Sequence, residues 1–126
     1  MPAYYKIYKE WRLVMSTGAG VLTMAEALGH QEKLLKDPDF SRGFSQLMDL
    51  TQVSKLEFGT EDLRVLAQRN IFSPDSRRAI LVSSDFLFGV SRMFAIFRDS
   101  LGETGIRVFR NLDPAIEWVL ARNTFA

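Results

Sequence analysis

The sequence predicts an α/β domain in which helices cover a small, mostly parallel β-sheet. Short apolar segments at 46–53, 78–83 and 105–110 have the length and composition of buried strands. An amphipathic helical pattern follows each of these segments, and crossover helices of this kind join parallel strands. No linker, internal repeat or low-complexity stretch interrupts the alternation. We therefore expect a single layered domain over residues 1–126.

The first part of the chain predicts a strand pair. Apolar residues alternate with partners of the other face between residues 4 and 21, which is the period of a strand. Residues 10–12 would form the turn. Gly18 and Gly20 would end the second strand or introduce a bulge into it.

Capping residues mark the starts of the helices. Thr23 is expected to cap the first helix, with Glu26 as its capping-box partner. Thr60 is expected to cap the second helix, and Asp85 or Ser84 the third. Asp113 would open the last helix, giving the order β-β-α-β-α-β-α-β-α.

The third helix, at 86–101, is rich in Phe and Met. Its spacing predicts an apolar stripe that either packs on the sheet or lines a pocket for an apolar ligand; the stripe comprises Phe86, Val90, Met93, Phe94, Phe97 and Leu101. Phe88 falls on the other side of the helix. It would form an exposed patch with Ala95 and Ile96 for self-association or a partner, or pack under loop 72–76 or the last helix.

Composition excludes several classes of function. The chain has 126 residues, 47% of them apolar, and a net charge of +1, so no strong field favours nucleic acid. The absence of cysteine excludes disulfides, thiol catalysis and thiolate metal sites. No apolar run approaches the length of a membrane span. We expect a cytoplasmic protein that does not insert stably into membranes or bind nucleic acid.

Residues suited to catalysis are scattered. His30 is the only histidine, and we expect it to be a surface or half-buried side chain, because metal ligands come in clusters. Glu57, Glu61 and Asp62 lie close together, but helix N-termini attract acidic residues for electrostatic reasons alone. Gly18 and Gly20 lack the further residues of a phosphate-binding loop. The sequence therefore predicts no enzyme activity, no metal and no cofactor.

Several segments in succession resemble a known group of domains. These are DLTQV at 49–53, FSPDSRRAILV at 72–82, FLFGVSRMFAIFR at 86–98 and VFRNLDPAIEW at 108–118. Their order resembles the SpoIIAA-like, STAS-like domains, many of them from uncharacterised bacterial proteins, over nearly the whole chain. The resemblance implies the SpoIIAA-like fold. The wider group includes anti-sigma-factor antagonists, cytosolic domains of anion transporters and relatives of SEC14-type lipid carriers.

The resemblance also implies where regulation would occur. In the antagonists, a kinase phosphorylates a serine that follows the central strand at the start of the next helix. The corresponding loop here, residues 55–60, has no serine. Phe58 takes the acceptor position, or Thr60 does if the loop is longer by one or two residues. The resemblance therefore implies the fold without the phosphorylation switch.

Two non-enzymatic functions follow. The first is an interaction or regulatory module that binds a protein partner or a second copy of itself as a homodimer. Its surface would comprise Glu57, Phe58, Thr60, Glu61, Asp62, Asp85 and Phe88, at the carboxyl ends of parallel strands. The alternative is a SEC14-like binder of a small apolar ligand or lipid, lined by Phe86, Val90, Met93, Phe94 and Phe97.

Overall fold

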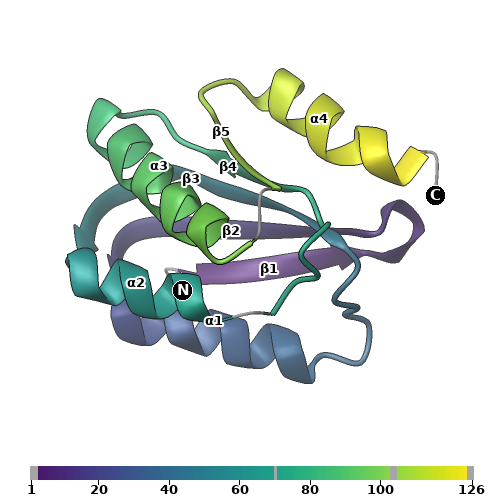
Figure 1. The fold of residues 1–126 in the computed structure, drawn as a ribbon, viewed down its shortest axis with the longest axis horizontal. Helices are drawn as coiled ribbons and strands as arrows, with labels where there is room; N and C mark the ends of the chain where they lie inside the picture. The colour runs from purple at the N-terminus through teal and green to yellow at the C-terminus, as the bar shows by residue number, and fades with distance from the viewer. Residues whose placement is uncertain (1–2, 70, 103–104, 125–126) are drawn as a thin grey trace.

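The computed structural model describes residues 3–69, 71–102 and 105–124. Strands and helices alternate along most of the chain (Figure 1). Their order is β1 (Ala3–Tyr8), a 3₁₀ turn (Lys9–Trp11), β2 (Leu13–Thr23), α1 (Met24–Lys36), β3 (Ser45–Glu57), α2 (Thr60–Gln68), β4 (Arg78–Leu81), α3 (Asp85–Ser100), β5 (Ile106–Phe109) and α4 (Leu112–Thr124). None of these helices, within the described part of the chain, is long and apolar enough to cross a bilayer.

The five strands form one sheet in the order β1-β2-β3-β4-β5. β1 is antiparallel to β2, and every other neighbouring pair is parallel. The predicted strands at 46–53, 78–83 and 105–110 correspond to β3, β4 and β5, which lie side by side and run in one direction. The predicted mostly parallel α/β sheet is confirmed.

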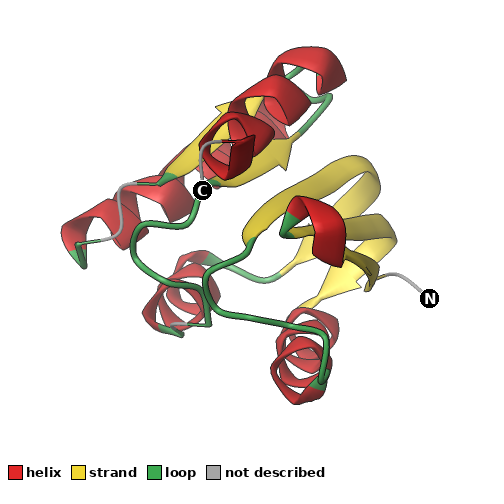
Figure 2. Cartoon of the chain, turned by 90° about the vertical axis from the view of Figure 1, so that its right-hand side faces the viewer, coloured by secondary structure: helices red, strands yellow, loops and turns green. Residues whose placement is uncertain are grey.

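Helices cover both faces of the sheet. One face packs against α4, where Leu13, Leu47 and Ala79 meet Ala115 and Val119. The other face, here called the three-helix face, packs against α1, α2 and α3. Alternate side chains along each strand point to opposite faces, so neighbouring residues of one strand serve different cores. Figure 2 shows the strands between α4 and the remaining helices.

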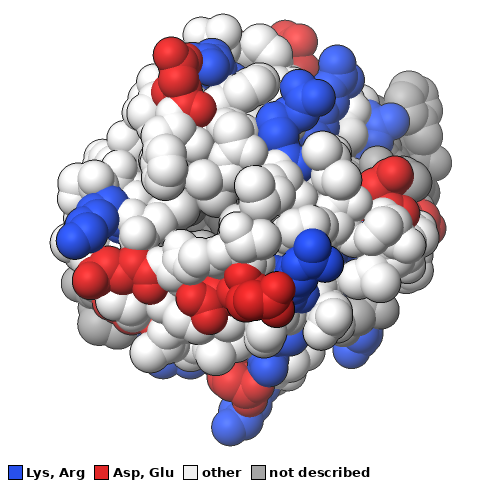
Figure 3. Space-filling view, turned by 60° about the vertical axis from the view of Figure 1, so that its left-hand side comes forward, with Lys and Arg blue, Asp and Glu red and all other residues white. Residues whose placement is uncertain are grey.

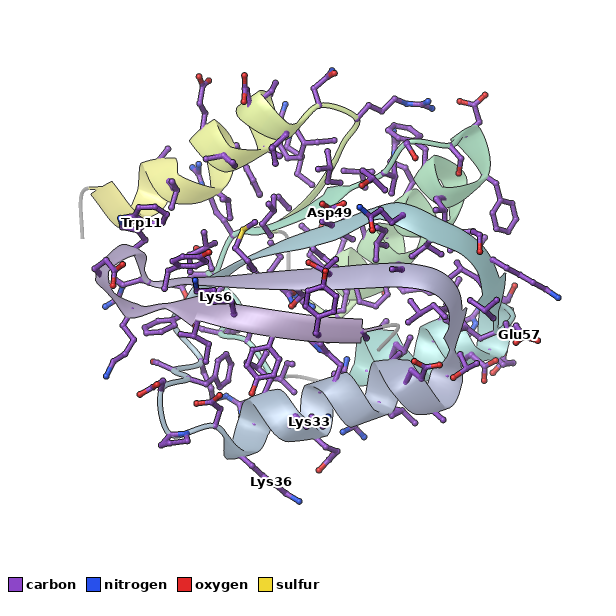
Figure 4. The ribbon with its side chains drawn as sticks, turned by 180° about the vertical axis from the view of Figure 1, so that it is seen from behind. Lys6, Trp11, Lys33, Lys36, Asp49 and Glu57 are labelled. Carbon is purple, nitrogen blue, oxygen red and sulfur yellow. The ribbon has the colours of Figure 1, made fainter. Side chains whose placement is uncertain are left out.

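β2 and β3 are longer than the sequence predicts and are irregular. They pair in parallel from Leu13↔Ser45 to Thr23↔Glu57, with register shifts between Thr17 and Ala19 and between Gly20 and Val21. Gly20 has φ of +65°, a conformation that favours glycine. β3 continues beyond the predicted end at residue 53, where exposed polar side chains hide the strand pattern. In Figure 4 the far ends of both strands curve toward the helices of the three-helix face.

The predicted helix caps are partly correct. Thr23 caps α1, because its Oγ1 accepts a hydrogen bond from the Glu26 N–H at 3.2 Å. Thr60 does not cap α2: Gly59 occupies that position, and Thr60 is the first helical residue. The Asp62 carboxylate accepts the Gly59 N–H at 3.1 Å, which supplies half of a capping box. Ser84, not Asp85, caps α3 through the Leu87 N–H.

The predicted buried stripe of α3 is only partly correct. Phe94 packs against the core of the three-helix face, but Phe86 is 67% exposed and Met93 is 38% exposed. The fully buried residues of the helix are Leu87, Ser91 and Arg98. Polar side chains belong to this buried face because they find partners on other elements. The Arg98 guanidinium donates to the backbone carbonyls of Ala67 and Arg69, at the end of α2. Such long-range partners leave no trace in the periodicity of the helix.

The two threonines at helix starts allow a matched test of the caps. Thr23→Ala removes the side chain that accepts from Glu26 and should lower the free energy of unfolding by about 1 kcal/mol. Thr60→Ala should change it by no more than about 0.5 kcal/mol, because Gly59 occupies the cap of α2. Urea unfolding of both variants followed by circular dichroism measures the difference. An equal loss in both variants would contradict the assignment of the caps.

Candidate functional site

A pocket of about 130 Å³ lies between the three-helix face of the sheet and helices α1, α2 and α3. Most of its lining is apolar, including Leu22, Leu50, Leu63, Leu66, Ile80 and Phe94. Gly18 lies close to the side chains of Leu50 and Val53, and a Cβ at this position would approach them to 3.1 and 3.2 Å. The bend of β2 and β3 over the helices provides the concave wall.

A line of polar side chains crosses the apolar sheet at this pocket. Arg78 Nε on β4 donates to Gln46 Oε1 on β3 at 3.1 Å, and Gln46 Nε2 donates to Ser16 Oγ on β2 at 2.9 Å. All three side chains are buried and line the pocket. Each belongs to a different strand, so the chain of hydrogen bonds runs across the sheet. It places one guanidinium in the wall of a largely apolar space.

The guanidinium of Arg78 keeps its charge at this position. Burial lowers the pKa of Arg78 to about 10, which leaves the group protonated at neutral pH. Its plane lies over the ring of Phe72, with 4.7 Å between the guanidinium carbon and the ring centroid. Phe94 lies on the pocket side at 6.0 Å. Aromatic faces of this kind stabilise a cation that water cannot reach.

His30 of α1 is the second polar group of interest. Its ring packs edge-on against Tyr5, with 5.5 Å between the centroids. Its Nε2 atom is buried and has no hydrogen-bond partner among the described residues. Burial, with the charges of Arg78 and Lys33, lowers the pKa of His30 to about 4, so the imidazole is neutral at pH 7. The expectation of a half-buried histidine was correct, but it overlooked a place in the pocket wall.

The pocket is suited to binding rather than to proton transfer. Among the described residues, its polar groups are one guanidinium, amides, hydroxyls and a neutral imidazole, and none of the lining residues is a carboxylate. Nowhere in residues 3–69, 71–102 and 105–124 do three or more His, Asp or Glu side chains gather as metal ligands would. Apolar walls with one cationic group and one hydrogen-bonding imidazole can hold a small amphipathic molecule.

Part of the predicted interaction surface also borders this pocket. Phe58 is half-buried and lines it, together with Leu56 at the end of β3. Glu57 lies at that end of the sheet, whereas Trp11 of the hairpin lies at the other end (Figure 4). Thr60 is exposed beside it.

The charged residues of the predicted surface mostly have local partners. Glu61 pairs with Arg64 at 3.5 Å, and Asp62 bonds the backbone of Gly59. Asp85, at the start of α3, pairs with Arg110 at 2.8 Å. Acidic side chains form a row on this side of the molecule, below a hollowed surface without charges (Figure 3).

Phe88 does not form the exposed patch that one interpretation predicts. It is half-buried and packs against the core formed by Ile80, Val82 and Leu87. The Arg110 guanidinium covers its ring at 4.4 Å. The alternative, in which Phe88 packs on the body of the domain, agrees better with this position, and the packing partners shown are β4, α3 and this arginine.

The predicted pocket residues of α3 divide into two groups. Val90 and Phe94 line the pocket, whereas Phe86, Met93 and Phe97 do not. Phe97 instead lies under the Arg64 guanidinium of α2, at 4.6 Å. Sequence reasoning missed the polar members Ser16, Gln46, Arg78 and Ser91. For Ser16, Gln46 and Arg78, the available signal was a polar residue within an otherwise apolar strand segment.

The buried imidazole should make stability depend on pH. The pKa of His30 is lower in the folded chain (about 4) than its ordinary value of 6.5, so the unfolded chain binds the proton first. The free energy of unfolding should therefore fall as pH decreases through this window, by at most about 1.4 kcal/mol per pH unit. Tyr5, Lys33 and Arg78 face the ring, and the pKa values of Tyr5 and Arg78, about 12 and about 10, lie outside this window. Urea unfolding between pH 5 and 6.5 should show this slope in the wild type and lose it in His30→Phe; equal slopes would refute the assignment.

Comparison with known proteins identifies the fold. No protein-family model and no curated protein matches the chain. The structure is similar to that of an uncharacterised protein of the DUF3478 family from Shewanella loihica, which has a SpoIIAA-like fold. The TM-score is 0.62, the sequences are 18% identical, and the similarity covers 93% of each chain. The protein therefore has the SpoIIAA-like fold that the sequence resemblance implied.

Proposed function

We propose that this protein is a non-enzymatic binding module that holds a small, largely apolar ligand between the sheet and helices α1–α3. The observation that carries the proposal is the pocket of about 130 Å³ with its apolar lining. A ligand that binds this lining removes apolar surface from water. It therefore stabilises the folded state, the more so the further its concentration exceeds its Kd.

The position of the pocket supports a regulatory role. Leu56 and Phe58 belong to the junction between β3 and α2, and Leu87 belongs to the start of α3. These segments lie at the carboxyl ends of parallel strands, where open α/β sheets usually bind ligands. A ligand in the pocket would touch the inner side of this junction. Its outer side carries Glu57, Thr60 and Glu61, which are exposed to a partner.

The chemistry of the lining supports binding over catalysis. General acid–base or nucleophilic catalysis needs an ionisable group and a reactive partner in mutual reach. Carboxylates are absent from the lining residues, and the pKa of His30, at about 4, disfavours its use as a base near neutral pH. Arg78 remains charged and does not exchange protons at neutral pH. Such groups orient a ligand rather than transform it.

A matched pair of α1 variants tests the ligand pocket. Ala27 lines the pocket, whereas Ala25 is exposed on the same helix. We expect 1-octanol, an apolar probe, to bind the wild type and to raise its Tm. Ala27→Leu fills part of the pocket and should weaken octanol binding about tenfold, because the added carbons occupy the ligand's space. Ala25→Leu should bind octanol as the wild type does. Isothermal titration calorimetry measures both affinities, and an absence of octanol binding to the wild type would refute the pocket's proposed role.

A second candidate function is a protein-interaction surface on the outer face of α3. Phe86 and Met93 lie two turns apart on this face and are 67% and 38% exposed, and Ile96 is 61% exposed. Large apolar side chains that gather on a surface mark sites of protein association. The face adjoins the start of α3 and the Asp85–Arg110 ion pair. A second copy of the chain is the partner that can be tested directly.

Sedimentation velocity over a range of protein concentrations tests this surface. The wild type should form a dimer as the concentration rises. The double variant Phe86→Ser, Met93→Ser should remain a monomer, because it lacks the apolar contact area. Leu112→Ser, which changes an exposed apolar residue of α4, is the control and should dimerise like the wild type. A wild type that stays monomeric at all concentrations would rule out self-association.

A further inference from the structure

We infer that the ligand of the pocket is an apolar carboxylate of the medium-chain fatty acid type, whose carboxylate group lies against Arg78 and His30. The inference rests on the proposed ligand pocket and adds the chemistry of the ligand. Three features of the described residues carry it: a buried cation in the wall, a buried imidazole nitrogen without a partner among them, and a mostly apolar lining to which they contribute no carboxylate.

The cation sets the sign of the ligand's charge. Arg78 is 5% exposed, and its Nε is held by Gln46 at 3.1 Å, which fixes the guanidinium against the ring of Phe72. Attraction between opposite charges is much stronger in such a site than in water. A hydrogen bond between a guanidinium and a carboxylate is also stronger than one between neutral groups, because both partners are charged. An anionic head group therefore gains more here than a neutral one, and a cationic head group is repelled.

The imidazole supplies a second contact for the same head group. His30 and Arg78 both line the pocket, and the charge of Arg78 acts on the pKa of His30. The Nε2 atom is buried without a partner in the described part of the chain, which is unfavourable for a polar group. A carboxylate oxygen can accept a hydrogen bond from this nitrogen when it carries a proton. The carboxylate would also favour the protonated imidazole, raising its pKa.

The other residues of the lining determine the chemistry of the ligand's tail. Beyond its polar residues the pocket presents aliphatic and aromatic side chains such as Leu22, Leu50, Leu63 and Phe94. Its volume of about 130 Å³ is close to that of an engineered apolar cavity that binds benzene. A medium-chain carboxylate would place roughly six carbons in this space, with the rest of its chain toward the open side of the pocket. None of the described residues that line the pocket is acidic, so none of them repels that carboxylate.

Three probes with the same tail and different head groups test the inference. At pH 7 we expect octanoate to bind at least about tenfold more tightly than 1-octanol in isothermal titration calorimetry, because of the charge-assisted hydrogen bonds. Octylamine should bind more weakly than octanol. Because His30 is the only histidine, its imidazole signal can be followed by NMR during a pH titration. Saturating octanoate should raise the pKa of His30 from about 4 toward its ordinary value, and octanol should not.

Variants locate the head group. Arg78→Met and His30→Phe should each weaken octanoate binding several-fold and leave octanol binding nearly unchanged. Arg77→Met is the matched control, because Arg77 precedes β4 but bonds to the Trp118 carbonyl of α4 at 2.8 Å. If Arg78→Met fails to fold, the wild-type NMR titration still decides, because an unchanged His30 pKa would overturn the inference. If octanol binds as tightly as octanoate, the ligand has no carboxylate at Arg78 and His30, but the proposal of an apolar-ligand pocket stands. If neither probe binds, both proposals are refuted.

Discussion

The parallel pairing of β2 with β3 is the constraint on which the rest of the structure depends. The two strands stay paired from Leu13 and Ser45 to Thr23 and Glu57, but only by shifting register twice. Bulges of this kind increase the local twist of a strand and bend it. β4 and β5, with four residues each, end before the bend. The far half of the β2–β3 pair therefore curves away from the rest of the sheet and over the helices, as Figure 1 shows at its left side. Without this bend the three-helix face would be flat, and α1, α2 and α3 would close directly on it.

The polar residues on this face cost more to bury than apolar residues would. An apolar side chain at Arg78 could fill the same space without the cost of taking a charge out of water, and buried ion sites often gain stability when replaced in this way. Three strands instead provide Arg78, Gln46 and Ser16 at positions that hydrogen-bond to one another. The arrangement fixes the direction of the guanidinium through side chains that are themselves buried. A group held this firmly beside an apolar space has the character of a binding site rather than of a core.

The sequence predicted the parts of the structure that depend on local pattern. Alternating strand and helix segments required parallel pairing, and the Thr23–Glu26 spacing identified the first helix. It did not predict the cap at Gly59, because the choice between Gly59 and Thr60 depends on the backbone of the preceding loop. It misplaced the buried face of α3, because Ser91 and Arg98 are buried through partners outside the helix. The pocket could not be predicted for the same reason. Ser16, Gln46 and Arg78 are about thirty residues apart in the chain and meet only through the pairing of the strands.

The junction between β3 and α2 joins the pocket to the surface within a few residues. The wider group that the sequence resembles includes anti-sigma-factor antagonists, in which a kinase phosphorylates a serine at this junction. Here a phosphate at Thr60 would meet the negative charges of Glu57, Glu61 and Asp62, and the helix start already has a cap at Gly59. Phe58 could link the pocket to the surface of this junction, because its side chain lines the pocket while the neighbouring residues Glu57 and Thr60 are exposed. A ligand shifts such a junction only if it binds one of its conformations more tightly than another. Under the proposed function, contact between a ligand and Phe58 would meet that condition if Phe58 lay differently in two conformations of the junction. Such a response to the occupant of the pocket would need no added charge.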